Sequence, residues 1–86
     1  MTKPQPQKIM LAMPNKHPVQ TRIGQTLRRH RRAAGLTLEA AGSRAGIRMA
    51  NMSLIERGLV DPRISTLARI AEALRVPLRE ILLEAE

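Results

Sequence analysis

The sequence contains no cysteine and no aromatic residue. The lack of cysteine excludes disulfide bonds and thiolate metal sites, and the two histidines, His17 and His30, lie too far apart in the chain to form a zinc site. Without aromatic rings, the chain cannot stack bases as single-strand and RNA-binding modules do. A core limited to Leu, Ile, Val, Met and Ala favours packed helices over sheets. We therefore expect a helical protein with neither a metal nor a cofactor.

Acidic residues are absent from the first 35 positions, which carry eight Lys and Arg residues, whereas seven basic and seven acidic residues balance over positions 36–86. The net charge of +8 therefore belongs wholly to the N-terminal part. Such asymmetry indicates a polyanionic partner, either nucleic acid or an anionic membrane surface, and a solubilising basic tail is the alternative. Because the cations alternate with apolar positions in a folding pattern, a basic helix lying on a membrane is disfavoured.

Long hydrophobic runs are also missing from this chain. The longest near the N-terminus, Ile9–Met13, is too short to span a membrane or to form the core of a signal peptide. We therefore expect a cytoplasmic protein. The length of 86 residues suffices for one small domain with a limited core.

Prolines are concentrated at the start of the chain, where residues 1–20 hold four of the six. This density forbids a long helix there, and it predicts a flexible basic arm over residues 1–20 that precedes a folded domain over residues 21–86. The apolar run Ile9–Met13 interrupts the polar arm. It docks on the domain or on a second copy of the chain, or it is an accident of an unstructured tail.

Apolar residues at helical spacing predict a first helix over about residues 22–34, with Thr21 as its N-cap and Gly35 as its stop. The inward stripe of this helix comprises Ile23, Leu27, Arg31 and Ala34. Arg31 is the anomaly, because a cation on a buried stripe needs a carboxylate partner.

Four further amphipathic segments follow, over about residues 38–45, 49–57 and 64–74 and from residue 77 onward. The residues expected to face inward on them are Ala41, Ala45, Met52, Ile55, Ile64, Leu67, Ile70, Ala71, Leu74, Leu78, Ile81 and Leu82. Five helices with short connections predict a compact all-α bundle.

The segment Gly35–Gly58 reads as two short helices hinged at Gly46, with Thr37 as the cap of the first. This is the layout of a helix-turn-helix, over about residues 38–57, in which the second helix enters the major groove of DNA. The pattern therefore predicts sequence-specific binding of double-stranded DNA.

The chain resembles the Cro/C1-type, or XRE-like, helix-turn-helix family. The resembling pieces are Ile23-Gly24-x-x-Leu27-Arg28-x-x-Arg31, Gly35-Leu36-Thr37, Ala45-Gly46-Ile47, Ser53-x-Ile55-Glu56-Arg57-Gly58, Pro62, and Leu67-x-x-Ile70-Ala71-x-Ala73-Leu74-x-Val76. The resemblance covers about residues 23–82 and implies a five-helix, lambda-repressor-like DNA-binding domain. In such proteins the arginine of the first helix pairs with the glutamate that ends the recognition helix, which implies a structural ion pair between Arg31 and Glu56.

Three positions depart from the family pattern. Leu38 stands where the family often has a glutamine that braces against a DNA phosphate. Arg48 and Arg63 stand at the probable N-caps of two helices, where an arginine has no acceptor to offer and where the helix dipole disfavours a cation. An anionic group of DNA would supply the missing acceptor and counter-charge at both positions. We therefore expect Arg48 to reach a phosphate or a guanine edge, and Arg63 to contact a phosphate.

The resemblance, together with side-chain chemistry, yields the candidate DNA contacts. The residues expected to contact bases are Arg48, Met49, Ala50, Asn51, Ser53 and Leu54. The residues expected to contact phosphates are Arg22, Arg28, Arg44, Arg57, Arg63 and Lys16. Each of these basic residues has a solvated surface charge as its alternative role.

One small domain reads too few base pairs for a genome, so we expect a homodimer on a palindromic operator, with Leu59 and Leu83 in the dimer seam. The expected function is a transcriptional regulator, more specifically a repressor. The alternative is an antitoxin-type protein whose N-terminal arm binds a protein partner while the helix-turn-helix controls its own gene. No nucleophile–base set, paired carboxylates or phosphate loop indicates an enzyme.

Overall fold

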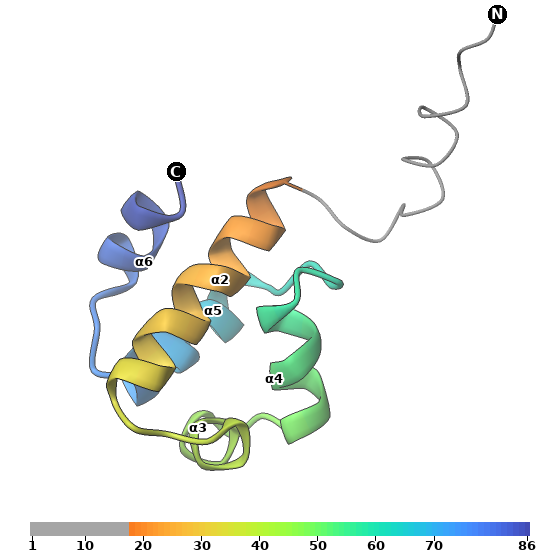
Figure 1. Ribbon diagram of the computed structural model, residues 1–86, viewed down its shortest axis with the longest axis vertical. Helices are drawn as coiled ribbons and strands as arrows, with labels where there is room; N and C mark the ends of the chain where they lie inside the picture. The colour runs from red at the N-terminus through yellow and green to blue at the C-terminus, as the bar shows by residue number, and fades with distance from the viewer. Residues whose placement is uncertain (1–17) are drawn as a thin grey trace, which may run out of the picture.

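Five helices and no strand make up residues 18–86, the part of the chain that the computed structural model describes. The helices are α2 (Pro18–Ala33), α3 (Leu38–Ala45), α4 (Met49–Glu56), α5 (Ile64–Ala73) and α6 (Leu78–Glu84). Helix α2 crosses the front of the domain with α5 behind it, and α4 and α6 lie on opposite sides of α2 (Figure 1). The expected all-α architecture is confirmed. No helix in this part of the chain is long and apolar enough to cross a membrane.

The core is built from aliphatic side chains that the helical spacing places on one face of each helix. The largest fully buried ones are Leu27, Met52, Ile70 and Ile81, which come from α2, α4, α5 and α6. Burying a side chain of this size contributes about 1.5–3 kcal/mol. These four residues therefore hold the helices in one unit without any aromatic ring.

The first helix begins earlier than the sequence predicts. Its first residue is Pro18, so Thr21 lies inside the helix and is not its N-cap, and residues 18–20 belong to the helix. A proline in the first turn disrupts no hydrogen bond, because the N–H groups of that turn have no intrahelical acceptor. The helix thus takes in the last three residues of the predicted arm, and residues 1–17, with the Ile9–Met13 run, lie outside the described residues.

Three of the residues expected to face the core are exposed instead. Ala34 follows the end of α2, where the chain has left the helical path. Ile64 is 61% exposed because it is the first residue of α5 and lies beyond the edge of the core. Leu82 is 38% exposed and lines a surface groove beside Val19 and Leu83.

Helices α2 and α4 cross at very short range, and a glycine permits this. A Cβ atom built on Gly24 would lie 2.4 Å from the carbonyl oxygen of Glu56, which is closer than any side chain tolerates. The first helix therefore contacts the end of α4 through its bare backbone. This crossing sets the position of α4 relative to the rest of the domain.

Arg31 and Glu56 join the same two helices by a buried ion pair. Arg31 Nε donates to Glu56 Oε2 at 2.7 Å, and Nη2 donates to Oε1 at 3.0 Å. The remaining nitrogen, Nη1, donates to the carbonyl oxygen of Leu36 at 2.8 Å. Hydrogen bonding to Glu56 raises the pKa of Arg31 above its ordinary value, and the attraction of the two charges adds to this, although burial opposes it. Each of the three side-chain nitrogens of Arg31 therefore has a hydrogen-bond acceptor.

Arg75 is the one non-glycine residue with a left-handed backbone within residues 18–86, with φ of 60°. It follows the end of α5, and its N–H donates to the carbonyl oxygen of Glu72 at 3.0 Å. The corresponding left-handed positions after α2, α3 and α4 are glycines, at Gly35, Gly46 and Gly58. For an L-residue with a side chain this conformation costs about 1–2 kcal/mol.

We predict that Arg75→Gly raises the free energy of unfolding by about 1 kcal/mol, because glycine adopts the left-handed conformation without steric cost. Urea unfolding followed by circular dichroism measures the change. Ala68→Gly is the matched control: Ala68 is exposed inside α5, so this variant should lose about 0.5–1 kcal/mol. A loss of stability in both variants would contradict the prediction.

We also predict that Glu56→Gln lowers the free energy of unfolding by about 3–5 kcal/mol, because it leaves the buried Arg31 guanidinium without a counter-charge. A double variant, Arg31→Met with Glu56→Met, should recover most of that loss, since removing both charges leaves nothing buried and unpaired. The same unfolding assay compares the two. A single variant as stable as the parent would show that the pair is not needed for folding.

Candidate nucleic-acid interface

A tight turn sets the angle between α3 and α4. Gly46 has φ of 72°, and its N–H faces the carbonyl oxygens of Gly42 and Ser43, while Ile47 N donates to Gly42 O at 2.7 Å. Gly42 is needed as well, because a Cβ atom there would lie 2.4 Å from Ile47 O. The predicted hinge is therefore present, with one glycine for the turn and one for the close approach.

The first turn of α4 presents an exposed face. Met49 is 54% exposed, and Arg48, Ala50 and Asn51 are exposed beside it. On the opposite face, Met52, Ile55 and Glu56 are buried against the core. Helix α4 lies at the edge of the domain, on the side away from α6 (Figure 1), so this face is accessible to a ligand as large as a duplex.

Two of the six residues expected to contact bases are less accessible. Ser53 and Leu54 are both half-buried. Ser53 lines a small pocket toward α2 and the start of α3. The exposed candidates are thus the four consecutive residues 48–51 at the N-terminal end of α4.

Arginines occupy the N-caps of both α4 and α5. Neither Arg48 nor Arg63 makes a side-chain capping bond. By contrast, the Oγ1 atom of Thr37 accepts from the N–H of Ala40 at 3.0 Å at the start of α3. The first-turn N–H groups of α4 and α5 therefore lack a capping side chain, and each start carries an exposed guanidinium. A phosphate oxygen is a suitable acceptor for both kinds of donor.

Two of the expected phosphate contacts are brought together in space. Arg28 of α2 and Arg57, which follows α4, line one pocket of about 180 Å³. Leu38 and Ser53 complete its walls, and the Arg31–Glu56 pair also lines it. Arg28 and Arg57 are both exposed. The start of α3, where the sequence lacks a glutamine, thus has two guanidinium groups beside it.

The other basic candidates are placed differently. Arg22 lies on the α6 side, where its Nε donates to the carbonyl oxygen of Ala85 at 2.8 Å and ties the end of α6 to α2. Arg44 is exposed in the last turn of α3 and lines a cleft with residues of α5. Lys16 lies outside the described residues, as does the arm that was expected to bind a protein partner.

The two residues expected in a dimer seam differ in exposure. Leu83 is 67% exposed, whereas Leu59 is half-buried. Leu83 lines a mainly apolar groove between the start of α2 and α6. The other residues of this groove are Val19, Arg22, Ile23, Arg79, Leu82, Ala85 and Glu86.

Sequence reasoning missed Arg69 and Thr66. Both lie on α5 and line a groove beside the exposed start of α4, together with Arg48, Ala50 and Asn51. Their positions on α5 mark them only as outward-facing. The groove that they share with the start of α4 is what adds them to the candidate interface.

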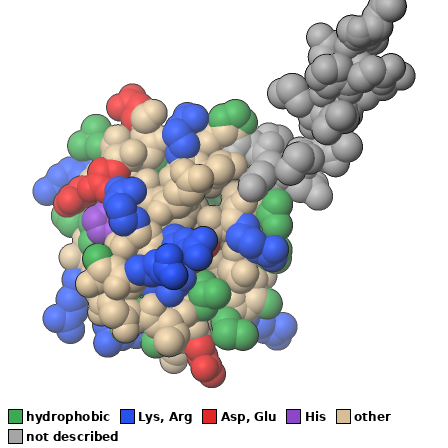
Figure 2. All heavy atoms as spheres, viewed as in Figure 1, with side chains coloured by type: hydrophobic (Ala, Val, Ile, Leu, Met, Phe, Trp, Pro, Cys, Tyr) green, Lys and Arg blue, Asp and Glu red, His purple; other side chains and the backbone are tan. Residues whose placement is uncertain are grey.

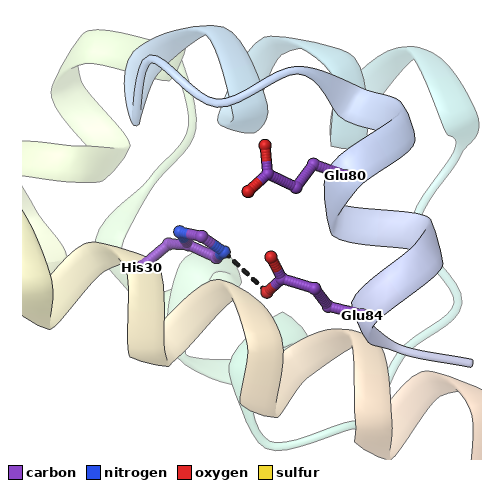
Figure 3. A group of neighbouring side chains, drawn as sticks. All are labelled: His30, Glu80 and Glu84. Atoms are coloured by element: carbon purple, nitrogen blue, oxygen red, sulfur yellow. Dashed lines mark hydrogen bonds and ion pairs between the residues drawn. The ribbon is translucent and has the colours of Figure 1, made fainter.

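One cluster with metal-type donors occurs within residues 18–86. His30 of α2 and the pair Glu80 and Glu84 of α6 face one another, and their ligand atoms lie within 4.8 Å (Figure 3). His30 Nε2 lies 2.8 Å from Glu84 Oε1, and Arg29 pairs with the same carboxylate. The hydrogen bond to His30 is the main reason that the pKa of Glu84 is lowered, with Arg29 adding to the effect and desolvation opposing it. Glu84 already pairs with His30 and Arg29, and these contacts join α6 to α2. We therefore assign no metal to the cluster.

Charge is unevenly distributed over the surface. In the face that Figure 2 shows, acidic side chains gather mainly toward α6, with a further acidic group at the bottom, and basic side chains spread over the whole face. A surface rich in basic side chains suits a polyanionic partner.

Comparison with known proteins identifies the fold. The model of the helix-turn-helix domain family matches residues 22–83. No curated protein sequence matches the chain. Among solved structures, the clp gene regulator ClgR from Corynebacterium glutamicum superposes with a TM-score of 0.75 at 27% identity, over 78% of this chain and 87% of that one. A second ClgR structure superposes with a TM-score of 0.76 at 27% identity, over 78% and 71%.

The restriction-modification controller protein C.AhdI from Aeromonas hydrophila is also similar, with a TM-score of 0.70 at 30% identity over 71% of this chain and 92% of that one. The similarity thus extends over more than two thirds of this chain and of each neighbour. The chain therefore belongs to the helix-turn-helix domain family, and it is a DNA-binding regulator of the Cro/C1 type.

Proposed function

We propose that this protein represses transcription by binding a palindromic operator as a homodimer. The observation that carries the proposal is the exposed face of residues 48–51, held at the edge of the domain by a glycine turn and a buried ion pair. A rigid helix with an exposed face is what major-groove recognition requires. Such a protein represses by occupying its operator and excluding polymerase.

Base recognition is assigned to the start of α4. Arg48 reaches a guanine through O6 and N7, and Asn51 reaches an adenine through N6 and N7. Met49 and Ala50 contact thymine methyl groups. Since two of these four residues have no polar group to offer, part of the selectivity comes from the shape and deformability of the DNA.

Phosphate recognition is assigned to two places that flank α4. Arg28 and Arg57 hold one phosphate over the pocket at the start of α3, and their position compensates for the apolar Leu38. Arg63 holds another at the uncapped start of α5. Because such contacts release counterions, binding weakens steeply as salt increases.

Dimerisation is assigned to the groove between α2 and α6. Val19 and Leu83 are more than half exposed, and Leu82 extends the same apolar surface. An apolar patch rimmed by Arg79 and Glu86 is the composition of an interface core with a charged rim. Leu59, half-buried in the loop after α4, is proposed to extend the same seam. Two copies joined here would present their recognition helices to half-sites about 34–36 Å apart.

Selection of random duplex DNA by the purified protein, at one near-physiological salt concentration, tests the proposal. We expect enrichment of an inverted repeat whose half-sites lie about one helical turn apart. Leu83→Asp should sediment as a monomer and retain only weak binding to a half-site. Binding without enrichment of any sequence would contradict a specific regulator, and a single unrepeated motif would contradict the dimer.

We predict different behaviour for the two capping arginines. Arg48→Ala should weaken operator binding and relax the preference at one base position, at a cost of about 1–3 kcal/mol. Arg63→Ala should weaken binding to all sequences alike and reduce the salt slope by about one. Fluorescence anisotropy on the operator and on single-base variants, at several salt concentrations, measures both. Equal effects of the two substitutions would contradict this division of roles.

A further inference from the structure

We propose that the cleft between α3 and α5 binds a phosphate group. The cleft has a volume of about 430 Å³ and is lined by Arg44, Ala45, Arg69, Glu72, Ala73 and Arg75. Arg44 comes from the last turn of α3, whereas Arg69 and Glu72 lie one turn apart on α5 and Arg75 follows its end. Three arginines and one glutamate therefore line a single hollow, and their formal charges sum to two positive charges.

The three arginines lack counter-charges. Within residues 18–86, none of them takes part in an ion pair or a side-chain hydrogen bond. Elsewhere in the same range, Arg22, Arg29 and Arg31 each have an acceptor. Like charges that line one hollow repel one another. An anion bound in the hollow attracts all three arginines and offsets this repulsion.

The backbone of Arg75 supplies a second, independent observation. The end of α5 requires a left-handed residue, and three other helices of the domain place glycine at that position. Arg75 instead keeps a long side chain in a strained conformation, and that side chain lines the cleft. The left-handed conformation itself closes the C-terminus of α5, because Val76 N donates to the carbonyl oxygen of Ala71 at 2.9 Å. What the helix end does not explain is an arginine there in place of glycine, and strained residues of this kind are enriched at functional positions.

Phosphate is the anion that fits this set of donors. Guanidinium groups bind phosphate oxygens in pairs and keep their charge at every relevant pH. The small side chains of Ala45 and Ala73 leave room for a tetrahedral group between the arginines.

The phosphate has two possible sources with the same chemistry. Arg69 also lines the groove beside Arg48 and Asn51, so the cleft adjoins the surface assigned to DNA, and a backbone phosphate outside the recognised bases is one source. This source rests on the proposed function. A free phosphate compound is the other, and binding of it would place an effector beside the recognition helix.

Three variants separate the cleft from general charge effects. Arg75→Gly and Arg69→Gln each remove one guanidinium from the cleft. Because Arg75→Gly is expected to unfold at a higher temperature than the parent protein, a loss of binding in this variant is not caused by a loss of folding. Arg32→Gln removes an exposed arginine at the end of α2, away from the cleft, and serves as the matched control.

Two titrations of the full chain test the proposal. The first adds pyrophosphate and follows the amide resonances by NMR. The second measures binding of a random-sequence duplex against salt. For a free ligand, pyrophosphate shifts the resonances around residues 44, 69 and 75, and the two cleft variants bind it about tenfold or more weakly than the control. For DNA, the salt slope falls by about one in the cleft variants and more than in Arg32→Gln.

Either result supports phosphate binding in the cleft. The pyrophosphate result does so even if no operator is found. Two results together would overturn the proposal. In the first, pyrophosphate binds all variants equally or binds none of them. In the second, the salt slopes of the cleft variants match that of Arg32→Gln.

Discussion

The buried ion pair between Arg31 and Glu56 is the interaction on which the candidate interface depends. It joins the middle of α2 to the end of α4 by two hydrogen bonds, and a third bond from Arg31 fixes the loop that leads into α3. Helices α3 and α4 are only eight residues each, so neither would be stable alone in water. A short recognition helix keeps its orientation only if its far end is fixed, and Glu56 is that far end. The pair also lines the pocket of Arg28 and Arg57, to which a phosphate contact is assigned in our proposal.

Close backbone contacts at two glycines hold the helices in place together with the ion pair. Gly24 lets α2 approach the end of α4, and Gly42 lets α3 approach the residues that open α4. A side chain at either glycine would collide with the backbone of the neighbouring segment and force the two apart. The consequence is a division of the surface. Residues 48–51 face outward on one side of α2, and the apolar groove of Leu82 and Leu83 lies on the side of α6. The proposed contacts with DNA and the proposed contacts between copies therefore use different faces.

Much of this arrangement follows from local sequence. Helical spacing predicts the five helices to within one residue at most of their ends, because apolar stripes and left-handed glycines are local signals. The anomaly of Arg31 predicts a buried carboxylate partner, because an isolated buried charge is too unstable to persist. The missing caps at Arg48 and Arg63 are equally visible in the sequence. The start of α2 was mispredicted because Thr21 is an acceptable cap, whereas Pro18 is an even more suitable first-turn residue.

The sequence by itself therefore determined the helices, the hinge, the ion pair and the residues that lie at the start of the recognition helix. Tertiary structure alone decided which surface side chains share a site. Arg69 on α5 and Arg75 after its end look like ordinary outward arginines, and only the packing of α5 against α3 brings both into one cleft with Arg44. Arg69 also lines one groove with Arg48. Arg22 was equally ambiguous until the end of α6 was placed next to it. The physical reason is that periodicity reports the direction of a side chain relative to its own helix, whereas a site depends on the distances between helices.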